Sequence, residues 1–244
     1  MHLLQRLFAT VYDPVMAPLE HGRVGHQRTA LLAQAYGHVL DLGAGTGANL
    51  EHLPASVDRV TAIEPDPAMR AHLVRHLSRL AASGSHRWQV MAGAGEGTGM
   101  LTTPAPATLT APAATVPRRM QVEVVDAVAE ALPLPDASVD VAIATLVLCT
   151  VSDPELAVAE LRRVLRPGGE LLVLEHVASH QPGRLRLQHA ITPAWKVVAR
   201  GCHLDRDTRA TLATGGFDVS DVTAWQLSDN SRLTAAITGV ARPA

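Results

Sequence analysis

A glycine-rich turn directly after a short apolar strand constrains this chain more than any other feature. Residues 38–47 read HVLDLGAGTG, so the apolar run ends in Asp41 and then in a turn that holds three glycines. Glycine has no Cβ, which lets the backbone turn tightly and brings N–H groups and the start of a helix, predicted at Ala48, close to a bound molecule. This pattern is typical of a site for a ligand derived from a nucleotide.

A second apolar run ends in an acid at a distance that fits the first. Val60–Ile63 is followed by Glu64, which comes 23 residues after Asp41. A carboxylate at the tip of the neighbouring parallel strand can accept hydrogen bonds from both hydroxyls of a ribose. The two stretches together therefore predict one site at the carboxyl edge of a parallel sheet.

The charge of Asp41 separates two classes of ligand. Residues 43–48, GAGTGA, satisfy the dinucleotide fingerprint G-x-G-x-x-G/A, which favours a nicotinamide-dependent reductase. However, Asp41 stands two places before the first glycine, where it would repel a pyrophosphate and could accept a hydrogen bond from an ammonium group. An ordinary strand-end cap is the alternative interpretation of Asp41. The pattern favours a cationic cofactor, and the chain lacks a Tyr-x-x-x-Lys pair for hydride transfer.

On these residues the chain resembles the class I S-adenosylmethionine-dependent methyltransferases. The first motif of that family looks like DLGAGTG at 41–47, and its second ends like Glu64-Pro65-Asp66. The resemblance implies an α/β, Rossmann-like fold: a seven-stranded, mostly parallel sheet in the order 3-2-1-4-5-7-6 with helices on both faces. It also implies S-adenosylmethionine as the cofactor, and it covers nearly the whole chain apart from residues 83–119.

Further candidate contacts come from the same resemblance. The Tyr-Asp segment at 12–13 would form a lid over the methionine end of the cofactor, with a capped helix start as the alternative. Val128 stands where the family usually has an Asp that bonds the adenine, which leaves the backbone of Ala129 and the side chain of Glu130. Met69 belongs to an apolar helical stripe and is a candidate for packing on the adenine. The predicted cofactor-binding residues are Tyr12, Asp41, Gly43, Ala44, Gly45, Glu64, Pro65, Met69, Ala129, Glu130, Thr145 and Leu146.

The remaining pattern predicts one domain, 1–244, with three special segments. Residues 1–35 read as an N-terminal helical lid, and 178–203, after an apolar strand, as a substrate lid. Residues 83–119 are dominated by Gly, Ala, Thr and Pro and are interpreted as a mobile, low-complexity insertion. Helices are expected after Pro65, after a Ser152-Asp153-Pro154-Glu155 capping box and over 207–214; strands are expected at 121–125, 140–148, 170–176, 217–222 and 233–240.

Composition excludes several other classes of protein. The formal net charge is −2 over 244 residues and no Lys/Arg cluster stands out, so neither a nucleic-acid groove nor an anionic membrane surface is indicated. No apolar run reaches the roughly 18 residues of a membrane span, and no N-terminal membrane anchor is expected. Cys149 and Cys202 read as reduced, buried thiols, which favours a cytoplasmic protein. No metal-ligand spacing occurs, so no metal is expected.

Longer stretches of sequence resemble particular groups within this family. Residues 145–151, 163–177 and 191–208 look like animal methyltransferase-like proteins that methylate small thiols, whereas ALPLPDASVD at 131–140 is similar to ubiquinone and menaquinone biosynthesis C-methyltransferases. We therefore expect in-line methyl transfer to a small, lipophilic molecule, with a thiol as one candidate acceptor. A quinol-type C-methyltransferase and a non-catalytic S-adenosylmethionine-binding protein are the alternatives, and the oligomeric state stays open.

A thiol or hydroxyl acceptor would need a base, and two histidines are candidates. His176 lies at the predicted end of a central strand, and His189 lies in the predicted substrate lid. Either could remove the acceptor's proton during transfer. The alternative for both is a histidine that bonds only to local backbone.

Overall fold

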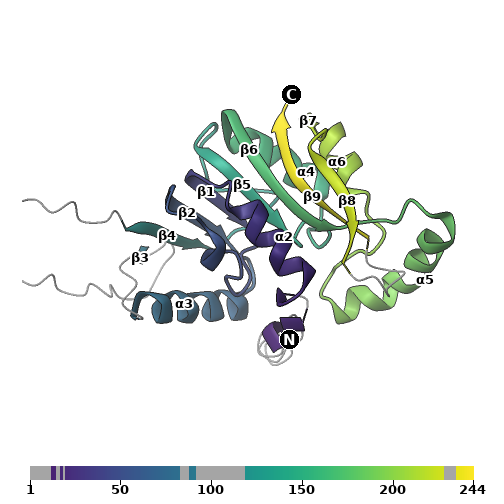
Figure 1. The fold of residues 1–244 in the computed structure, drawn as a ribbon, viewed down its shortest axis with the longest axis horizontal. Helices are drawn as coiled ribbons and strands as arrows, with labels where there is room; N and C mark the ends of the chain where they lie inside the picture. The colour runs from purple at the N-terminus through teal and green to yellow at the C-terminus, as the bar shows by residue number, and fades with distance from the viewer. Residues whose placement is uncertain (1–11, 15–16, 19, 83–87, 92–118, 228–234) are drawn as a thin grey trace, which may run out of the picture.

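The protein is an α/β fold with one continuous sheet between two layers of helices (Figure 1). The computed structural model describes residues 12–14, 17–18, 20–82, 88–91, 119–227 and 235–244. Residues 1–11, 15–16 and 19 of the expected helical lid at 1–35, and most of the 83–119 insertion, lie outside these residues. Within the described ranges the helices are α2 (Arg23–Leu32), α3 (Pro67–Ala82), α4 (Pro154–Val164), α5 (Pro182–Val198) and α6 (Thr208–Thr214), with a 3-10 turn, η1, at Leu50–His52.

The sheet follows the expected order but has more strands than expected. The strands are β1 (Gly37–Leu42), β2 (Val57–Ile63), β3 (Trp88–Met91), β4 (Met120–Val125), β5 (Val139–Thr145), β6 (Leu165–His176), β7 (Phe217–Asp218), β8 (Val222–Gln226) and β9 (Ala235–Pro243). Their order is β3-β4-β2-β1-β5-β6-β9-β7, with β8 also paired to β9. From β4 to β9 this is the predicted 3-2-1-4-5-7, and β9 runs antiparallel to its neighbours.

Two local features account for the count of nine strands, instead of seven, in the described residues. The single strand predicted at 217–222 is interrupted after β7 and resumes as β8, which ends four residues beyond the predicted end, because the Asp218 carboxylate accepts the Ser220 N–H at 2.9 Å and turns the chain between them. The other extra strand, β3, lies within the segment interpreted as an insertion and pairs in parallel with β4. Its first residue, Trp88, is buried, so this short apolar part of 83–119 does join the packed core.

The prediction of a helix starting at Ala48 was wrong. The turn instead continues through Asn49 into η1, which ends at His52 and is followed by Leu53 in an extended conformation with ψ 136°. Proline disfavours helical backbone in the residue before it, and Pro54 follows Leu53 directly. Pro54 therefore stops the helix after one turn and keeps Asn49 at the edge of the sheet.

Two apolar clusters hold the sheet between its helices. On one face Leu42, Ala144 and Val173 pack with Ala157 and Leu161 of α4. The other face carries α2 and α3, which Figure 1 shows on the side opposite α4 and α6. Because β1, β2, β4, β5 and β6 are all parallel, their carboxyl ends meet at one edge, which is where ligands bind in sheets of this kind.

No helix in the described ranges has both the length and the apolar character needed to cross a bilayer. The longest are α3 and α5, and each carries several basic side chains along its length.

Helix α4 starts with a different cap from the predicted capping box. The side chain of Asp153, rather than that of Ser152, accepts the N–H groups of Glu155 and Leu156, both at 3.0 Å. Pro154 then occupies the first helical position, where its missing N–H costs nothing.

We predict that Asp153→Ala lowers the free energy of unfolding by about 1 kcal/mol, because two helix N–H groups lose their acceptor. Chemical denaturation of the variant measures this loss. Ser152→Ala is the matched control and should stay within about 0.5 kcal/mol of the parent protein. Equal losses in the two variants would show that the cap is shared.

Candidate functional site

The glycine turn between β1 and η1 has the backbone conformation that the sequence predicted. Gly43, Gly45 and Gly47 have φ values of +64°, +58° and +97°. A Cβ on Gly43 would lie 2.3 Å from Cγ2 of Val147, so the loop after β5 can approach only because this side chain is missing. The N–H of Ala44 donates to the carbonyl of Ile63 at 2.9 Å and ties the turn to β2.

Glu64 bridges the glycine turn and the end of β2. One carboxylate oxygen accepts the Gly45 N–H at 2.9 Å, and the other accepts the Asp66 N–H at 2.8 Å. The side chain is buried, and this burial raises the pKa of the carboxyl group. An ionised carboxylate has about four acceptor sites, so both oxygens can still accept a further hydrogen bond each. The ribose-binding role of Glu64 remains a prediction that this geometry permits.

Asp41 is fully buried and only half satisfied. Its Oδ1 accepts Nδ2 of Asn49 at 2.7 Å, whereas Oδ2 is buried and receives no hydrogen bond from the residues that the structure describes. Burial raises the pKa of Asp41 to about 6, against the lowering effects of Asn49 and Arg28. A buried acceptor without a donor is rare in native proteins, so Oδ2 marks a place for a donor from a bound molecule.

A buried cation, Arg28 of α2, completes a polar network around Asp41. Its Nη1 donates to Oδ1 of Asn49 and to Oγ1 of Thr145, the latter at 3.0 Å. Its Nη2 pairs with Glu20 at 2.7 Å. The Asn49 amide in turn donates to Thr145 at 3.0 Å. We call Glu20, Arg28, Asp41, Asn49 and Thr145 the polar network.

Sequence reasoning missed Arg28 and Asn49. Arg28 lies between Gln27 and Thr29 and only the fold shows it on the buried face of α2, and Asn49 comes two residues after the last glycine of the turn. A cation in a mixed helix and an amide behind a glycine turn are weak signals taken separately. They carry meaning only together, when the fold places them within hydrogen-bond distance of one another.

The Tyr-Asp segment contacts the glycine turn, and its role as a lid stays a prediction. Oδ1 of Asp13 accepts the Thr46 hydroxyl at 2.7 Å. Burial raises the pKa of Tyr12 to about 12, and the nearby charge of Arg28 opposes this rise. The Tyr12 phenol is therefore within electrostatic range of the polar network.

A second segment, from the C-terminal part of the chain, lies along the same edge of the sheet. We call residues 200–206, which follow α5, the strap. Arg200 pairs with Asp66 at 2.7 Å, beyond the end of β2. At the other side, the His203 N–H donates to the Cys149 carbonyl at 2.8 Å, and Arg206 donates to the carbonyls of Leu148 and Val151. The strap thus spans the carboxyl edge from β2 to the loop after β5.

The loop after β5 is fixed by a buried acid that sequence reasoning also missed. Leu146 has a φ of +56°, an unusual value for a residue with a side chain. Glu175 on β6 stabilises the following turn by accepting the N–H groups of Val147 and Leu148, both at 2.8 Å. Complete burial raises the pKa of Glu175 to about 7. Thr145 and Leu146 are therefore held rigidly beside the glycine turn.

The other predicted residues divide into two groups. Met69 and Ala129 are buried near the same edge. His176 is the last residue of β6, two residues after Leu174, which is the register partner of Thr145; the side chains of His176 and Thr145 therefore lie on the same face of the sheet.

In contrast, His189 is exposed on α5 and pairs with Asp205 at 2.7 Å. Pro65 is exposed at the site's edge. Glu130 directs its carboxylate to the Asp153 N–H at 2.9 Å and so anchors the start of α4.

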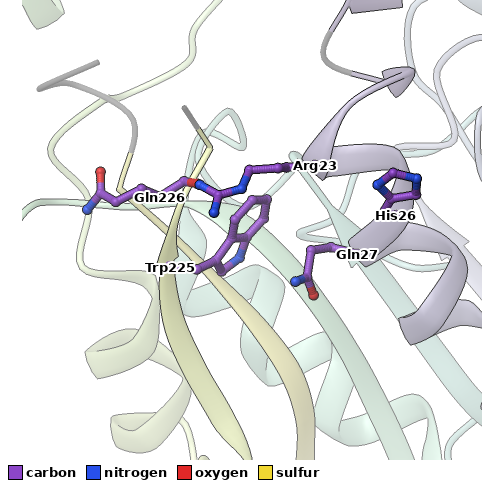
Figure 2. A pocket seen from close by; sticks show the side chains of 5 residues that line it. All are labelled: Arg23, His26, Gln27, Trp225 and Gln226. Carbon is purple, nitrogen blue, oxygen red and sulfur yellow. The ribbon is translucent and has the colours of Figure 1, made fainter. Parts of the chain in front are cut away.

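A cavity of about 300 Å³ lies between α2 and β8 (Figure 2). Arg23, His26, Gln27, Trp225 and Gln226 line it, and Figure 2 shows the Arg23 side chain beside the indole of Trp225. Trp225 and His176 are both register partners of Ala236, so they project from the same face of the sheet. The Trp225 Nε1 is buried without a hydrogen-bond acceptor among the described residues.

Known proteins with similar sequences are methyltransferases. Residues 89–173 match the family model described as "Methyltransferase domain". The chain is 31% identical to rat thiol S-methyltransferase TMT1B over 73% of its own length and 59% of the relative's. It is 30% identical to the human TMT1B over 83% of its own length and 72% of the relative's. With rat TMT1B the chain thus spans less than two thirds of the relative's length.

Two further matches are more restricted. A stretch of 54 residues, 22% of each chain, is 54% identical to the ubiquinone/menaquinone biosynthesis C-methyltransferase UbiE of Hahella chejuensis. Among solved structures, a SAM-dependent methyltransferase from Thermotoga maritima, titled a possible histamine N-methyltransferase, superposes with a TM-score of 0.58 at 18% identity. That match covers 99% of this chain and 97% of the other. This last match supports the fold alone.

The residues at the carboxyl edge fit the cofactor of this family. S-adenosylmethionine carries an ammonium, a sulfonium and a ribose, and the site offers the orphaned oxygen of Asp41 and the carboxylate of Glu64 beside a glycine turn with room for close approach. The cationic ligand inferred from Asp41 is thus in accord with the comparisons. The chain belongs to the class I S-adenosylmethionine-dependent methyltransferases, together with the thiol S-methyltransferases of the TMT1B type.

Proposed function

We propose that this protein transfers the methyl group of S-adenosylmethionine to a small, lipophilic acceptor, and that the acceptor is a thiol. Cofactor binding is supported mainly by Asp41, which is buried between Arg28 and the glycine turn and has one carboxylate oxygen without a hydrogen bond from the described residues. An amino-acid group carries an ammonium and a carboxylate on the same carbon. Asp41 suits the first and the Arg28 guanidinium suits the second.

The protein's own part in the reaction is positioning and exclusion of water. When bound, S-adenosylmethionine supplies an electrophilic methyl group on a positively charged sulfur. Glu64 would orient the ribose, while Tyr12 and the strap would cover the site from two sides. Alignment in a site without water accounts for most of the rate in a displacement of this kind.

The thiol acceptor is supported by the names of the TMT1B relatives and by the surroundings of the site. Helix α5 leads into the strap and exposes Leu187, Trp195, Val197 and Val198 by 41%, 40%, 81% and 70%. Exposed apolar side chains on the helix that leads into the strap suit a lipophilic substrate. The indole of Trp225, in the cavity of Figure 2, offers an apolar surface for the body of such a molecule.

The short match to UbiE favours a second candidate reaction, methylation of a quinol ring carbon. The two reactions give different products, an S-methyl thioether and a C-methyl ring. A panel of small thiols and quinols with isotope-labelled S-adenosylmethionine, analysed by mass spectrometry, distinguishes them. Thioether formation supports the proposal, and ring methylation supports the second candidate. Binding of the cofactor without turnover on any acceptor would support a non-catalytic S-adenosylmethionine-binding protein.

His176 is the proposed base for a thiol acceptor, because it is buried at the carboxyl end of β6 on the same face as Thr145. We expect His176→Gln to lower kcat with the best thiol by about 100-fold, the lower end of the range for general bases. Calorimetry should show unchanged affinity for S-adenosylhomocysteine. His189→Gln, the exposed control, should keep kcat, and a larger loss in that variant would transfer the role to His189.

The ribose contact is tested at Glu64. Glu64→Ala should weaken binding of S-adenosylmethionine by about 1.5 to 3 kcal/mol, the scale of hydrogen bonds to a charged group. Isothermal titration calorimetry gives the affinity. Glu123→Ala is the control, since it removes a different, partly exposed carboxylate, which pairs with Arg59 at 2.8 Å. Because Glu64 also anchors Gly45, the unfolding temperature of each empty variant shows whether the turn itself has moved. Unchanged affinity with Glu64→Ala would exclude the ribose role.

Affinity for the cofactor should depend on pH through Asp41. Its pKa in the empty protein is about 6, so at lower pH a proton occupies the carboxylate and competes with the cofactor's ammonium. From pH 7 to pH 5 the ionised fraction falls, and we expect the affinity to fall about tenfold. Titrations at several pH values check this, and Asp41→Asn should give a weak, flat profile. A parent affinity that is constant over this range would contradict the ammonium contact.

A further inference from the structure

The two cysteines of the chain, far apart in sequence, lie next to each other over the site. Cys149 belongs to the loop after β5 and Cys202 to the strap, and their Sγ atoms are 3.6 Å apart. Both are free thiols. A disulfide bond is about 2.05 Å long, so a closing movement of about 1.5 Å would join them.

The backbone around the pair already holds the two segments together. The His203 N–H, next to Cys202, donates to the carbonyl of Cys149 itself at 2.8 Å. Arg206 adds two contacts to the same loop, with Leu148 and Val151. The short distance between the sulfur atoms therefore follows from a docked interface between strap and loop, rather than from one side-chain rotamer.

The two thiols differ in exposure and in their surroundings. Cys149 is 2% exposed, whereas Cys202 is partly exposed. Interaction between the two thiols lowers the pKa of Cys202, and the same interaction together with burial raises the pKa of Cys149. A thiol attacks as its thiolate, so Cys202 is suited to meet an external reagent first. The carboxylate of Glu175 accepts the backbone N–H of Cys149 at 3.4 Å and also interacts with the Cys149 thiol, so it can accept the thiol proton.

We propose that Cys149 and Cys202 form a redox modification site that reacts with small disulfides and reversibly ties the strap to the loop after β5. Cys202 loses its proton and attacks one sulfur of R–S–S–R; the Cys202–S–R bond forms, the original S–S bond breaks, and the first R–S⁻ leaves with that proton. Cys149 then gives its proton to Glu175 and attacks Cys202 Sγ, which releases the second R–S⁻ to take up this proton. Two protein thiols are oxidised and one disulfide is reduced to two thiols.

The position of the pair gives the modification a physical consequence. The strap already contacts Asp66 at one end and the loop after β5 at the other. A disulfide at Cys202 would add a covalent bond to the hydrogen-bonded contact between the strap and the loop after β5. The strap could then no longer move away from that loop. Only the source of the oxidant rests on the proposed function: a thiol that is methylated when reduced would be the oxidant in its disulfide form.

The experiment uses oxidised glutathione on the full chain, in which these two are the only cysteines. After incubation and acid quench, we expect titratable thiols under denaturing conditions to fall from two to none, the intact mass to fall by two hydrogens, and dithiothreitol to restore both. Cys149→Ser should stop at a mixed disulfide with one glutathione on Cys202. Cys202→Ser should react at least tenfold more slowly. Two remaining thiols in the parent, or a stable glutathione adduct without ring closure, would overturn the proposal.

Hydrogen exchange tests the tie itself. In the oxidised protein the amides of residues 200–206 should exchange at least tenfold more slowly than in the reduced protein, and Cys202→Ser treated in the same way should show no slowing. Unchanged exchange in a protein proven to contain the disulfide would overturn the restriction of the strap. Neither measurement uses cofactor or acceptor, so these results are independent of whether the proposed methyl transfer is correct.

Discussion

The buried contact between Asp41, Asn49 and Arg28 is the interaction on which the rest of the site depends. Burial of a charge is costly unless it is paired and hydrogen-bonded, and here an anion and a cation share one amide side chain. The three residues come from β1, the turn before η1 and α2, so this contact fixes three segments relative to one another. It also leaves one acidic oxygen without a partner, and that deficit is what a cationic amino-acid group can satisfy.

Around this centre, acids are used to hold backbone. Glu64 fixes the glycine turn to β2, Glu175 fixes the loop after β5, and Glu130 fixes the start of α4. Each carboxylate accepts N–H groups that regular structure leaves without a partner where strands end and helices begin. The carboxyl edge of the sheet is thereby held by hydrogen bonds between carboxylates and the backbone. Such an edge can bind a polar cofactor and still exclude water once the strap and the Tyr-Asp segment lie over it.

Much of the framework could be predicted, and the errors have local causes. The glycine turn, the buried strand ending at Thr145 and the helix after Asp153 were visible in short patterns. The strand order came from the family resemblance, since spacing alone does not specify it. Trp88–Met91 was missed because the composition of its surroundings concealed a four-residue strand. The helix expected at Ala48 failed because the effect of Pro54, six residues later, was not weighed.

The sequence by itself determined the conformations that depend on neighbours in the chain: glycines where φ must be positive, apolar runs where strands are buried on both faces, and acids at strand ends. These follow from steric limits and from burial, which act over a few residues. Only the tertiary structure decided that Arg28 meets Asn49, that Glu175 holds the loop after β5, and that Cys149 faces Cys202. Such pairs are separated by 21 to 53 residues, and no short-range pattern links them; their proximity results from the packing of the whole sheet.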